Sequence, residues 1–305
     1  MLPLGKIIQN YGLGYHCYAD DTQLYLSFKP GTQDPSASIN ACLVDLQNWM
    51  NTSWLRLNSD KTEVLVVGAH HLKLAIGGDT VQYKDSVRNL GVILDGNLKL
   101  RQQVSAVVKS SFFHLRNIAK IKHLIPAEDL PALVHAFVSS RLDYCNALLI
   151  GSTDKVLRPL QLVQNAAARL LANAPRSSHI TPVLQTLHWL PVKWRINFKI
   201  CLLTFKALHQ KGPKYIADLL ELYAPPRTLR SANKMKLVIP RIHLTFGARA
   251  FSYAAPTLWN SLPQSVREAP SLDSFKKRLK THLFSLGFLQ QFLYKQLKIL
   301  FGHVT

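Results

Sequence analysis

The sequence has few cysteines, and their spacing does not match a metal-binding or disulfide-rich motif. Its four cysteines, Cys17, Cys42, Cys145 and Cys201, lie far apart, and no Cys-x-x-Cys pair occurs. This argues against a zinc site or a disulfide framework and is consistent with a reducing compartment. Also absent are a glycine-rich phosphate loop, a His-Glu-x-x-His motif and a Gly-x-Ser-x-Gly motif. The sequence therefore excludes the common motifs of P-loop enzymes, zinc proteases and serine hydrolases.

The sequence also lacks an uninterrupted apolar run of the length that spans a membrane. Residues 1–8 have neither the long apolar core nor the cleavage pattern of a signal peptide. The apolar segment from Leu283 to Leu300 is interrupted by Gln290, Gln291, Lys295, Gln296 and Lys298. That pattern favours an amphipathic helix. We expect an intracellular protein, nuclear or cytoplasmic, that is not secreted and has no membrane partner.

Acidic residues are scarce, and the resulting positive charge is unevenly placed. The chain has 37 Lys and Arg against 17 Asp and Glu, a formal net charge of +20. Residues 1–100 hold eight basic and nine acidic residues, whereas the rest holds 29 basic and eight acidic residues. A polyanion would neutralise this excess, and nucleic acid is the obvious one inside a cell. Plain solubility or attraction to a membrane surface are the alternatives.

Two adjacent acids near the start form the most informative pattern. Asp20 and Asp21 stand between the run 15–18 and the alternating run 24–28, which predicts a β-hairpin with acids at its tip. Adjacent carboxylates repel each other unless a cation lies between them, and their hard oxygens suit Mg²⁺ or Mn²⁺. The alternative is a solvated turn, but the aromatic and aliphatic flanks favour a site.

Several segments, in order along the chain, resemble motifs of one known family. His16–Tyr25 resembles the catalytic hairpin of reverse transcriptases from non-LTR retrotransposons, the long interspersed elements common in vertebrate genomes and especially in fish. Leu57–Glu63 is similar to the next motif of that family, and Asn89–Asp95 to the following hairpin, which grips the primer end. Phe251–Pro263 resembles a C-terminal stretch of the same elements, and the likeness continues to about residue 288.

The resemblance implies an RNA-directed DNA polymerase whose partners are an RNA template and a DNA primer; no specific protein partner is expected. It implies that Asp20 is the primary metal ligand and Asp21 a supporting acid, with Tyr18 and Ala19 close to the primer terminus. Two Mg²⁺ or Mn²⁺ ions can activate the attacking 3′-hydroxyl and stabilise the leaving pyrophosphate. Lys61 would lie near the pyrophosphate as a general acid. Alternatively, Lys61 is an exposed lysine in a turn.

The resemblance also implies parts of the enzyme that precede the hairpin, namely a third acid and the segments that bind the nucleotide and template. Because the hairpin begins within the first twenty residues, we expect those parts to lie outside this chain. The chain would then be a C-terminal fragment that holds one ion weakly and extends a primer negligibly by itself. One alternative is a non-enzymatic nucleic-acid-binding protein derived from the same element. Another is a pseudogene-like product without a cellular task.

Two further groups of residues are candidates for nucleic-acid binding. By the resemblance, Leu90 and Gly91 would shape the primer-grip hairpin, although Gly91 taken by itself favours a β-bulge. The basic residues Lys109, Arg116 and Lys120 fall mainly on one side of an expected helix and would contact phosphates. A solvated helix face is the alternative for these three.

The sequence predicts an α+β protein in three parts. Residues 1–95 would form a partial reverse-transcriptase palm, an antiparallel sheet with a covering helix at 35–52 and later strands at 62–67, 72–76, 80–83 and 87–94. Residues 96–223 would form a helical thumb-like domain, with helices at 98–123, 127–143, 153–173, 180–187, 192–210 and 214–222. Residues 224–305 would form a basic C-terminal region, with a loop, a strand near 236–239, a turn at 256–262 and a helix at 271–287.

Overall fold

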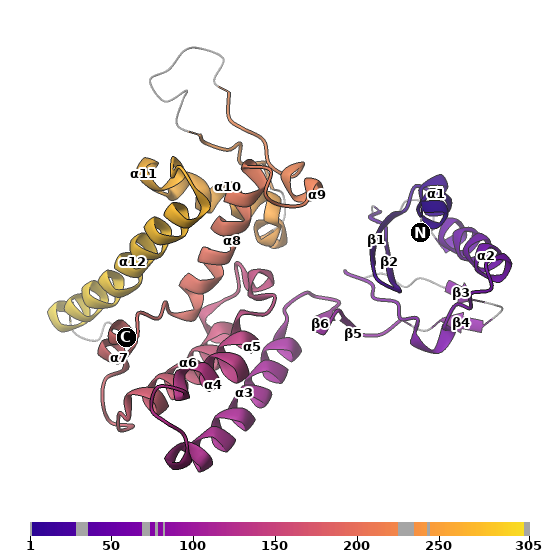
Figure 1. The fold of residues 1–305 in the computed structure, drawn as a ribbon. Coiled ribbons are helices and arrows are strands. Elements are labelled where there is room, and N and C mark those ends of the chain that lie inside the picture. Colours follow the sequence, from indigo (N-terminus) through magenta and orange to yellow (C-terminus); the bar gives the residue numbers. More distant parts are fainter. Residues whose placement is uncertain are drawn as a thin grey trace. The chain divides into compact units, whose positions relative to one another are not determined.

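The chain folds into two compact units, Met1–Gln103 and Val104–Thr305, which are drawn as a ribbon in Figure 1. The computed structural model describes residues 2–28, 36–68, 74–76, 79–81, 83–224, 235–242 and 245–301. Strands occur in the first unit and helices dominate the second, so the predicted mixed α+β class is confirmed.

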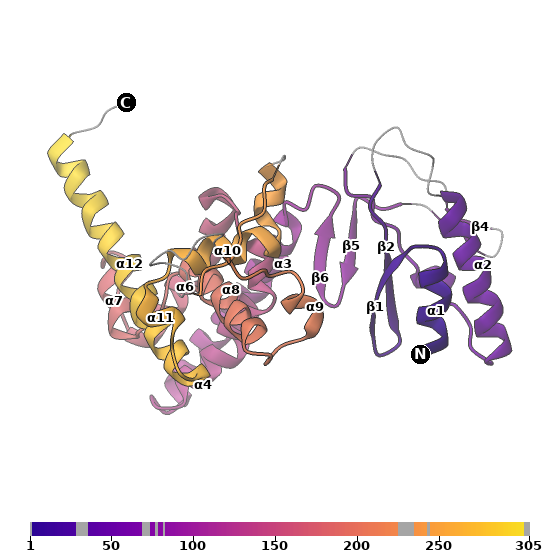
Figure 2. The same cartoon turned by 90° about the horizontal axis from the view of Figure 1, so that it is seen from above.

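The first unit consists of two helices and three short β-hairpins. Its helices are α1 (Leu2–Asn10) and α2 (Ser36–Thr52), and a 3₁₀ turn, η1, spans Ser59–Lys61. The antiparallel strand pairs are β1 (Gly14–Tyr18) with β2 (Asp21–Tyr25), β3 (Leu74–Ile76) with β4 (Asp79–Val81), and β5 (Ser86–Asn89) with β6 (Val92–Asp95). Figure 2 shows the β1–β2 hairpin beside α1.

The core of this unit lies between α1, α2 and one face of the β1–β2 hairpin. Its buried residues are Leu4, Ile8, Leu13, Cys42, Leu43 and Leu46, and Tyr15 and Leu24 of the hairpin pack against them. Helix α2 forms where it was predicted, because its apolar residues recur at helical spacing. Helix α1 was not predicted, although its buried residues Leu4 and Ile8 are four positions apart.

Two strands predicted for the first unit differ in the structure. The strand predicted at 62–67 is wrong, because only Val64 forms a β-bridge there, with Tyr83. A single strand at 87–94 is also wrong, because a turn at Leu90 and Gly91 divides that segment into β5 and β6. The described strands form three separate pairs instead of one continuous sheet. Of the hairpin predicted around residues 77–79, the strands are present, and residues 77–78 lie outside the described residues.

The second unit is helical. Its first half contains α3 (Arg101–Ile121, which starts just before the unit boundary), η2 (Lys122–Leu124), α4 (Leu130–Val134), a π-helical turn η3 (His135–Ser139), α5 (Ser140–Asp143), η4 (Asn146–Leu149) and α6 (Asp154–Ala172). Its second half contains α7 (Ile180–Thr186), α8 (Val192–Leu208), α9 (Lys214–Ala217), η5 (Thr245–Arg249), α10 (Phe251–Ser261), α11 (Gln264–Arg267) and α12 (Leu272–Phe301). Most of the predicted helices are present. The helix predicted at 214–222 ends at residue 217, and the one predicted at 127–143 contains the π-helical turn.

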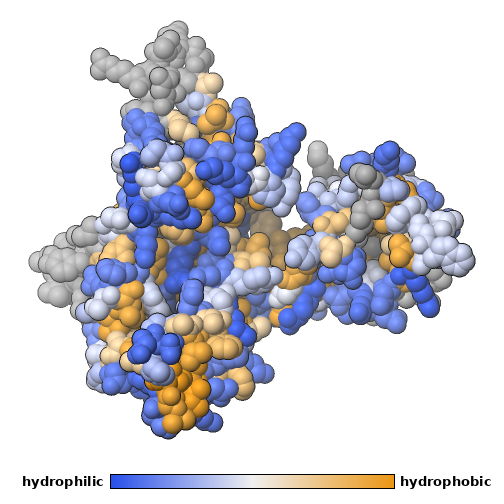
Figure 3. All heavy atoms as spheres, in the orientation of Figure 1, coloured by the Kyte–Doolittle hydropathy of each residue, from blue (hydrophilic) through white to orange (hydrophobic). Residues whose placement is uncertain are grey.

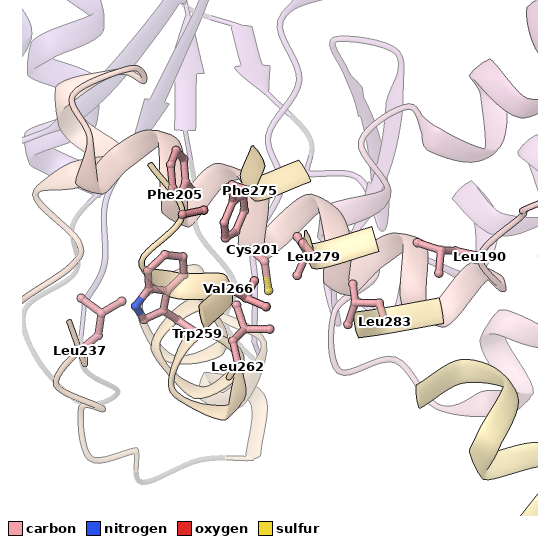
Figure 4. Close-up of a cluster of buried hydrophobic side chains, with 11 residues drawn as sticks. Leu190, Cys201, Phe205, Leu237, Trp259, Leu262, Val266, Phe275, Leu279 and Leu283 are labelled. Carbon is pink, nitrogen blue, oxygen red and sulfur yellow. The ribbon is translucent and has the colours of Figure 1, made fainter. Parts of the chain in front are cut away.

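A buried aromatic cluster joins α8, α10 and α12, as Figure 4 shows. Trp259 is fully buried at its centre, and its indole Nε1 donates a hydrogen bond to the carbonyl oxygen of Met235 at 2.7 Å. Phe205 stacks on Phe275 with the ring centroids 4.3 Å apart. Burial in this cluster raises the pKa of the Cys201 thiol to about 12, so this cysteine stays protonated and unreactive in the folded protein.

This shared core changes the predicted division of the chain. The boundary expected between residues 223 and 224 lies inside the second unit, because Leu237, Trp259 and Phe275 pack with residues of α8. The turn predicted at 256–262 is also wrong, because α10 continues through Pro256 to Ser261. Burial of Ala254, Ala255 and Trp259 on one side of α10 outweighs the cost of a proline inside the helix. At 236–239 only Leu237 forms a β-bridge, with Leu222.

Candidate functional site

The two acids lie at the tip of a tight hairpin. Tyr18 of β1 pairs with Asp21 of β2, which leaves only Ala19 and Asp20 in the turn. Asp20 is the second turn residue and Asp21 the first residue of β2, and both are exposed. Tyr18, at the end of β1, is 68% exposed. The bent hairpin predicted from the sequence is therefore present, and both carboxylates are open to solvent.

The backbone at the tip is unusual. Ala19 has a φ of 53°, in the left-handed region that disfavours any residue with a β-carbon. Glycine is the usual residue there, because it pays no steric penalty for that conformation. Residues held in such strained backbone conformations are found most often at functional sites, where the surrounding structure stabilises them. The tight turn places Asp20 and Asp21 next to each other at the tip of the hairpin. It requires a strained backbone conformation at Ala19.

One face of the hairpin packs inward and the other remains exposed. Tyr15 and Leu24 face the core of the first unit, opposite each other in the strand register. Because side chains alternate along a strand, Asp21 lies on the other face with Gln23 and Tyr25. On that face His16 stacks on Tyr25, with the ring centroids 5.1 Å apart and an angle of 22° between the rings. The acidic tip thus adjoins an exposed aromatic surface.

A hydrogen bond places the β5–β6 hairpin beside this face. The side-chain amide of Asn89 donates to Oε1 of Gln23 at 3.0 Å. Directly after Asn89 come Leu90 and Gly91, with φ values of 44° and 81°. Two successive positive φ values are typical of a type I′ hairpin turn. The pairing on either side is regular, so the bulge favoured for Gly91 is wrong. The structure therefore brings the Leu90–Gly91 hairpin next to the acidic one.

Lys61 lies in a turn that Asn58 fixes. The backbone N–H of Lys61 donates to the side-chain oxygen of Asn58 at 3.1 Å, and the hydroxyl of Thr62 donates to the Asn58 carbonyl at 2.8 Å. Lys61 itself is exposed. No ion pair found among the described residues joins it to Asp20 or Asp21. In the described part of the chain, Lys61 is therefore not in direct ionic contact with either acid.

The donor atoms of the acidic tip suit a hard divalent ion. Carboxylate oxygens are the ligands that Mg²⁺ and Mn²⁺ prefer. Within the described ranges no group of three or more His, Cys, Asp or Glu side chains is arranged to hold a metal. Asp20 and Asp21 can therefore supply only part of the roughly six oxygen ligands around Mg²⁺. The remaining ligands would be water, phosphate oxygens or another protein segment.

In the second unit, basic side chains line the exposed face of α3. Three basic residues on this face are exposed and are spaced seven and four positions apart: Lys109, Arg116 and Lys120. The opposite face of the helix is buried and consists of Val104, Ser111, Leu115 and Ile118. Phe113 lies between the basic residues on the same face and is 53% exposed. We call Lys109, Phe113, Arg116 and Lys120 the α3 stripe. The sequence prediction missed Phe113, whose helical spacing from Lys109 and Arg116 was the available signal.

The charge around this stripe is strongly positive. Helix α3 contains no acidic residue, and Val104–Thr305 holds 28 basic against eight acidic residues. Met1–Gln103 holds nine of each, so the whole net charge of +20 belongs to the second unit. In Figure 3 hydrophilic side chains cover much of the visible face of this unit, and apolar side chains gather in patches between them. An exposed positive surface of this kind attracts polyanions.

A comparison of this chain with models of protein families, with curated proteins and with solved structures gave no match in any of the three. Among the helices of the described segments, none combines the length and the apolar character needed to cross a bilayer.

The strain at Ala19 leads to a stability prediction. We expect Ala19→Gly to raise the free energy of unfolding of the first unit by about 1 kcal/mol, because glycine adopts a positive φ without a steric penalty. Ala41→Gly, at an exposed position inside α2, is the matched control and should lower that free energy by about 0.5–1 kcal/mol. Hydrogen exchange of the amides of α1 and α2 in increasing urea measures both changes. A loss of stability in Ala19→Gly would show that Ala19 is not strained.

Proposed function

We propose that this chain is part of a reverse transcriptase, an RNA-directed DNA polymerase of a non-LTR retrotransposon. The β1–β2 hairpin would carry the catalytic acids, the first unit would belong to the polymerase palm, and the helical second unit would act as a thumb. One observation carries this proposal. Tyr18, Ala19, Asp20 and Asp21 form the tight, exposed tip of the hairpin, so that neighbouring residues display two carboxylates and an aromatic ring to solvent.

Three residues of the tip would have direct roles in nucleotidyl transfer. Asp20 and Asp21 would hold Mg²⁺ or Mn²⁺, which supplies positive charge for the attacking 3′-oxygen and the leaving pyrophosphate. The exposed ring of Tyr18 would contact the terminal nucleotide of the primer. The Leu90–Gly91 turn, joined to the hairpin through Asn89 and Gln23, would support the primer strand. Lys61, in the turn that Asn58 fixes, would act as a general acid on the leaving pyrophosphate.

The second unit would hold the nucleic-acid backbone. Lys109, Arg116 and Lys120 present three cations along about three turns of one helix face. Contacts from such residues to phosphates fix the position of a strand without reading its sequence. Because bound cations are released from the nucleic acid, affinity of this kind falls steeply as salt rises.

The second candidate function is that of a nucleic-acid-binding protein without catalysis. It is favoured by the α3 stripe, which presents exposed cations on a helix without an acidic residue. Both functions require nucleic acid as the partner. They differ in whether the acidic tip binds a metal ion when a primer and template are present.

The first test measures metal binding at the hairpin tip. We expect the chain, mixed with an RNA template and DNA primer, to bind Mn²⁺ detectably by electron paramagnetic resonance. Asp20→Asn with Asp21→Asn should abolish most of that binding, because neutral amides are poor ligands for a hard cation. Glu128 and Asp129 form another exposed pair of adjacent acids, so Glu128→Gln with Asp129→Asn is the matched control. Equal losses in both double variants, or none in either, would contradict the catalytic assignment.

The second test measures the contribution of the α3 stripe to nucleic-acid binding. We expect replacement of Lys109, Arg116 and Lys120 by glutamine to weaken binding of a labelled oligonucleotide. The plot of log affinity against log salt should become shallower by about 2, because three phosphate contacts are lost. A control triple replaces Lys155, Lys211 and Lys214, which are exposed and lie outside α3, with glutamine. Binding that does not depend on salt, or equal changes in both triples, would argue against the stripe as the binding surface.

A further inference from the structure

Two phenylalanine rings lie exposed among the basic side chains of the second unit. Phe113 of α3 is 53% exposed and Phe137 of η3 is 41% exposed. The stripe thus contains apolar aromatic surface as well as positive charge. A purely electrostatic contact with phosphates has no use for exposed aromatic rings, so these two residues call for a separate explanation.

The imidazole of His114 connects the two rings. Phe113 and His114 meet edge to face, with centroids 5.3 Å apart and an angle of 80° between the rings. His114 and Phe137 are stacked, also with centroids 5.3 Å apart and with an angle of 24°. We call Phe113, His114 and Phe137 the ring cluster. It extends from the α3 stripe to a neighbouring element that is 24 residues further along the chain.

Arg141 holds the two sides of the ring cluster together. Its Nε donates to the hydroxyl of Ser110 at 3.0 Å, and its Nη1 donates to the carbonyl oxygen of Phe137 at 3.1 Å. One guanidinium therefore ties α3 to the π-helical turn that carries Phe137. Turns of this kind are rare and occur frequently at functional sites. The two elements that carry the rings are joined before a ligand arrives, which reduces the entropy lost on binding.

The surrounding charges favour an anionic ligand. Lys109 precedes Phe113 by one helical turn, Arg116 follows it, and Asp143 of α5 is paired with Arg195. Partial burial, with a smaller effect of the Arg141 charge, lowers the pKa of His114 and so favours the uncharged ring. The positive charge near the two phenyl rings therefore comes from the surrounding lysines and arginines and not from the imidazole.

We propose that the ring cluster is a stacking platform for an unpaired nucleobase, so that the α3 stripe binds single-stranded nucleic acid in preference to duplex. This inference rests on the proposed nucleic-acid binding and adds that the bound bases are unpaired. Every base has a π-face that can stack on an aromatic side chain, so the platform accepts any sequence. In a duplex both faces of each base are covered by neighbouring bases, whereas an unpaired base can turn onto Phe113 or Phe137.

The experiment compares strands that differ only in their bases. Fluorescence anisotropy is measured with a labelled oligothymidylate of about 15 nucleotides, which matches the length that single-strand binding sites cover, and with an abasic strand of equal length and charge. We expect the full chain to bind the thymidine strand about tenfold more tightly than the abasic strand. A duplex of equal length should bind more weakly than the thymidine strand at the same salt concentration.

Variants then assign the difference to the ring cluster. Phe113→Ala with Phe137→Ala should lower affinity for the thymidine strand about tenfold, to the level of the abasic strand, and leave abasic binding unchanged. Phe113→Trp should keep the preference, whereas Phe113→Leu, which is apolar but has no π-face, should weaken it. Phe246→Ala, at another exposed phenylalanine, is the matched control and should change nothing.

The outcomes separate this inference from the proposed function. Salt-dependent binding with equal affinity for thymidine and abasic strands overturns the stacking platform and leaves the stripe as a phosphate-binding surface. A preference for thymidine that survives in the double phenylalanine variant also overturns it. Absence of binding to both strands contradicts the proposed function as well. Should the double variant unfold, the comparison of Phe113→Leu with Phe113→Trp still decides: equal preference for the thymidine strand in both overturns the stacking platform.

Discussion

Repulsion between two neighbouring carboxylates is the constraint on which the proposed site depends. Asp20 is the second residue of a two-residue turn and Asp21 follows it directly, so the two carboxylates can approach each other. Between unit charges about 4 Å apart, the repulsion is about 1 kcal/mol in water and rises when solvent is excluded. Both acids are exposed here, which keeps the cost low in the free chain. A nucleic-acid strand that covered the tip would remove water, and a shared divalent cation would then offset the increased repulsion.

The distribution of charge between the two units is consistent with this requirement. The first unit has equal numbers of basic and acidic residues, and all of the net positive charge belongs to the second. Basic groups crowded around the aspartates would compete with a metal ion for the carboxylate oxygens. Among the described residues the acids of the tip have no ion-pair partner, while α3 presents cations without a neighbouring acid in the same helix. In our proposal, attraction of phosphates and binding of metal therefore belong to different units.

Local sequence patterns correctly predicted the helices and the hairpin that are determined mainly by neighbouring residues. The alternation around Asp20 and Asp21 predicted the hairpin, and the spacing of apolar residues predicted α2, α3, α6 and α8. Errors occurred where contacts distant in sequence decide the structure. Residues 62–67 have strand-forming side chains but only a single bridge to Tyr83. Pro256 suggested a turn, yet burial of Trp259 in a core shared with α8 and α12 extends the helix through it.

In the candidate site too, features set by neighbouring residues could be predicted from the sequence, whereas features set by contacts distant in sequence could not. Asp20 and Asp21 could be found from neighbouring residues, because the turn that displays them is local. No local rule places Leu90 at a positive φ, and none predicts the hydrogen bond from Asn89 to Gln23, whose residues are 66 positions apart. The contact of His114 with Phe137 likewise depends on how α3 packs against the π-helical turn. Contacts between side chains that are far apart in the sequence could therefore be identified only from the structure.

Hydroxyl-radical cleavage by bound iron tests most directly whether Asp20 and Asp21 hold a divalent ion beside the end of a nucleic-acid strand. Fe²⁺ replaces Mg²⁺ in a complex of the chain with an RNA template and a labelled DNA primer, and the radicals cut the nucleic acid near the ion. We predict cuts concentrated at the 3′ end of the primer, which disappear in Asp20→Asn with Asp21→Asn. Uniform cutting along the duplex, or an unchanged pattern in that variant, would contradict the site.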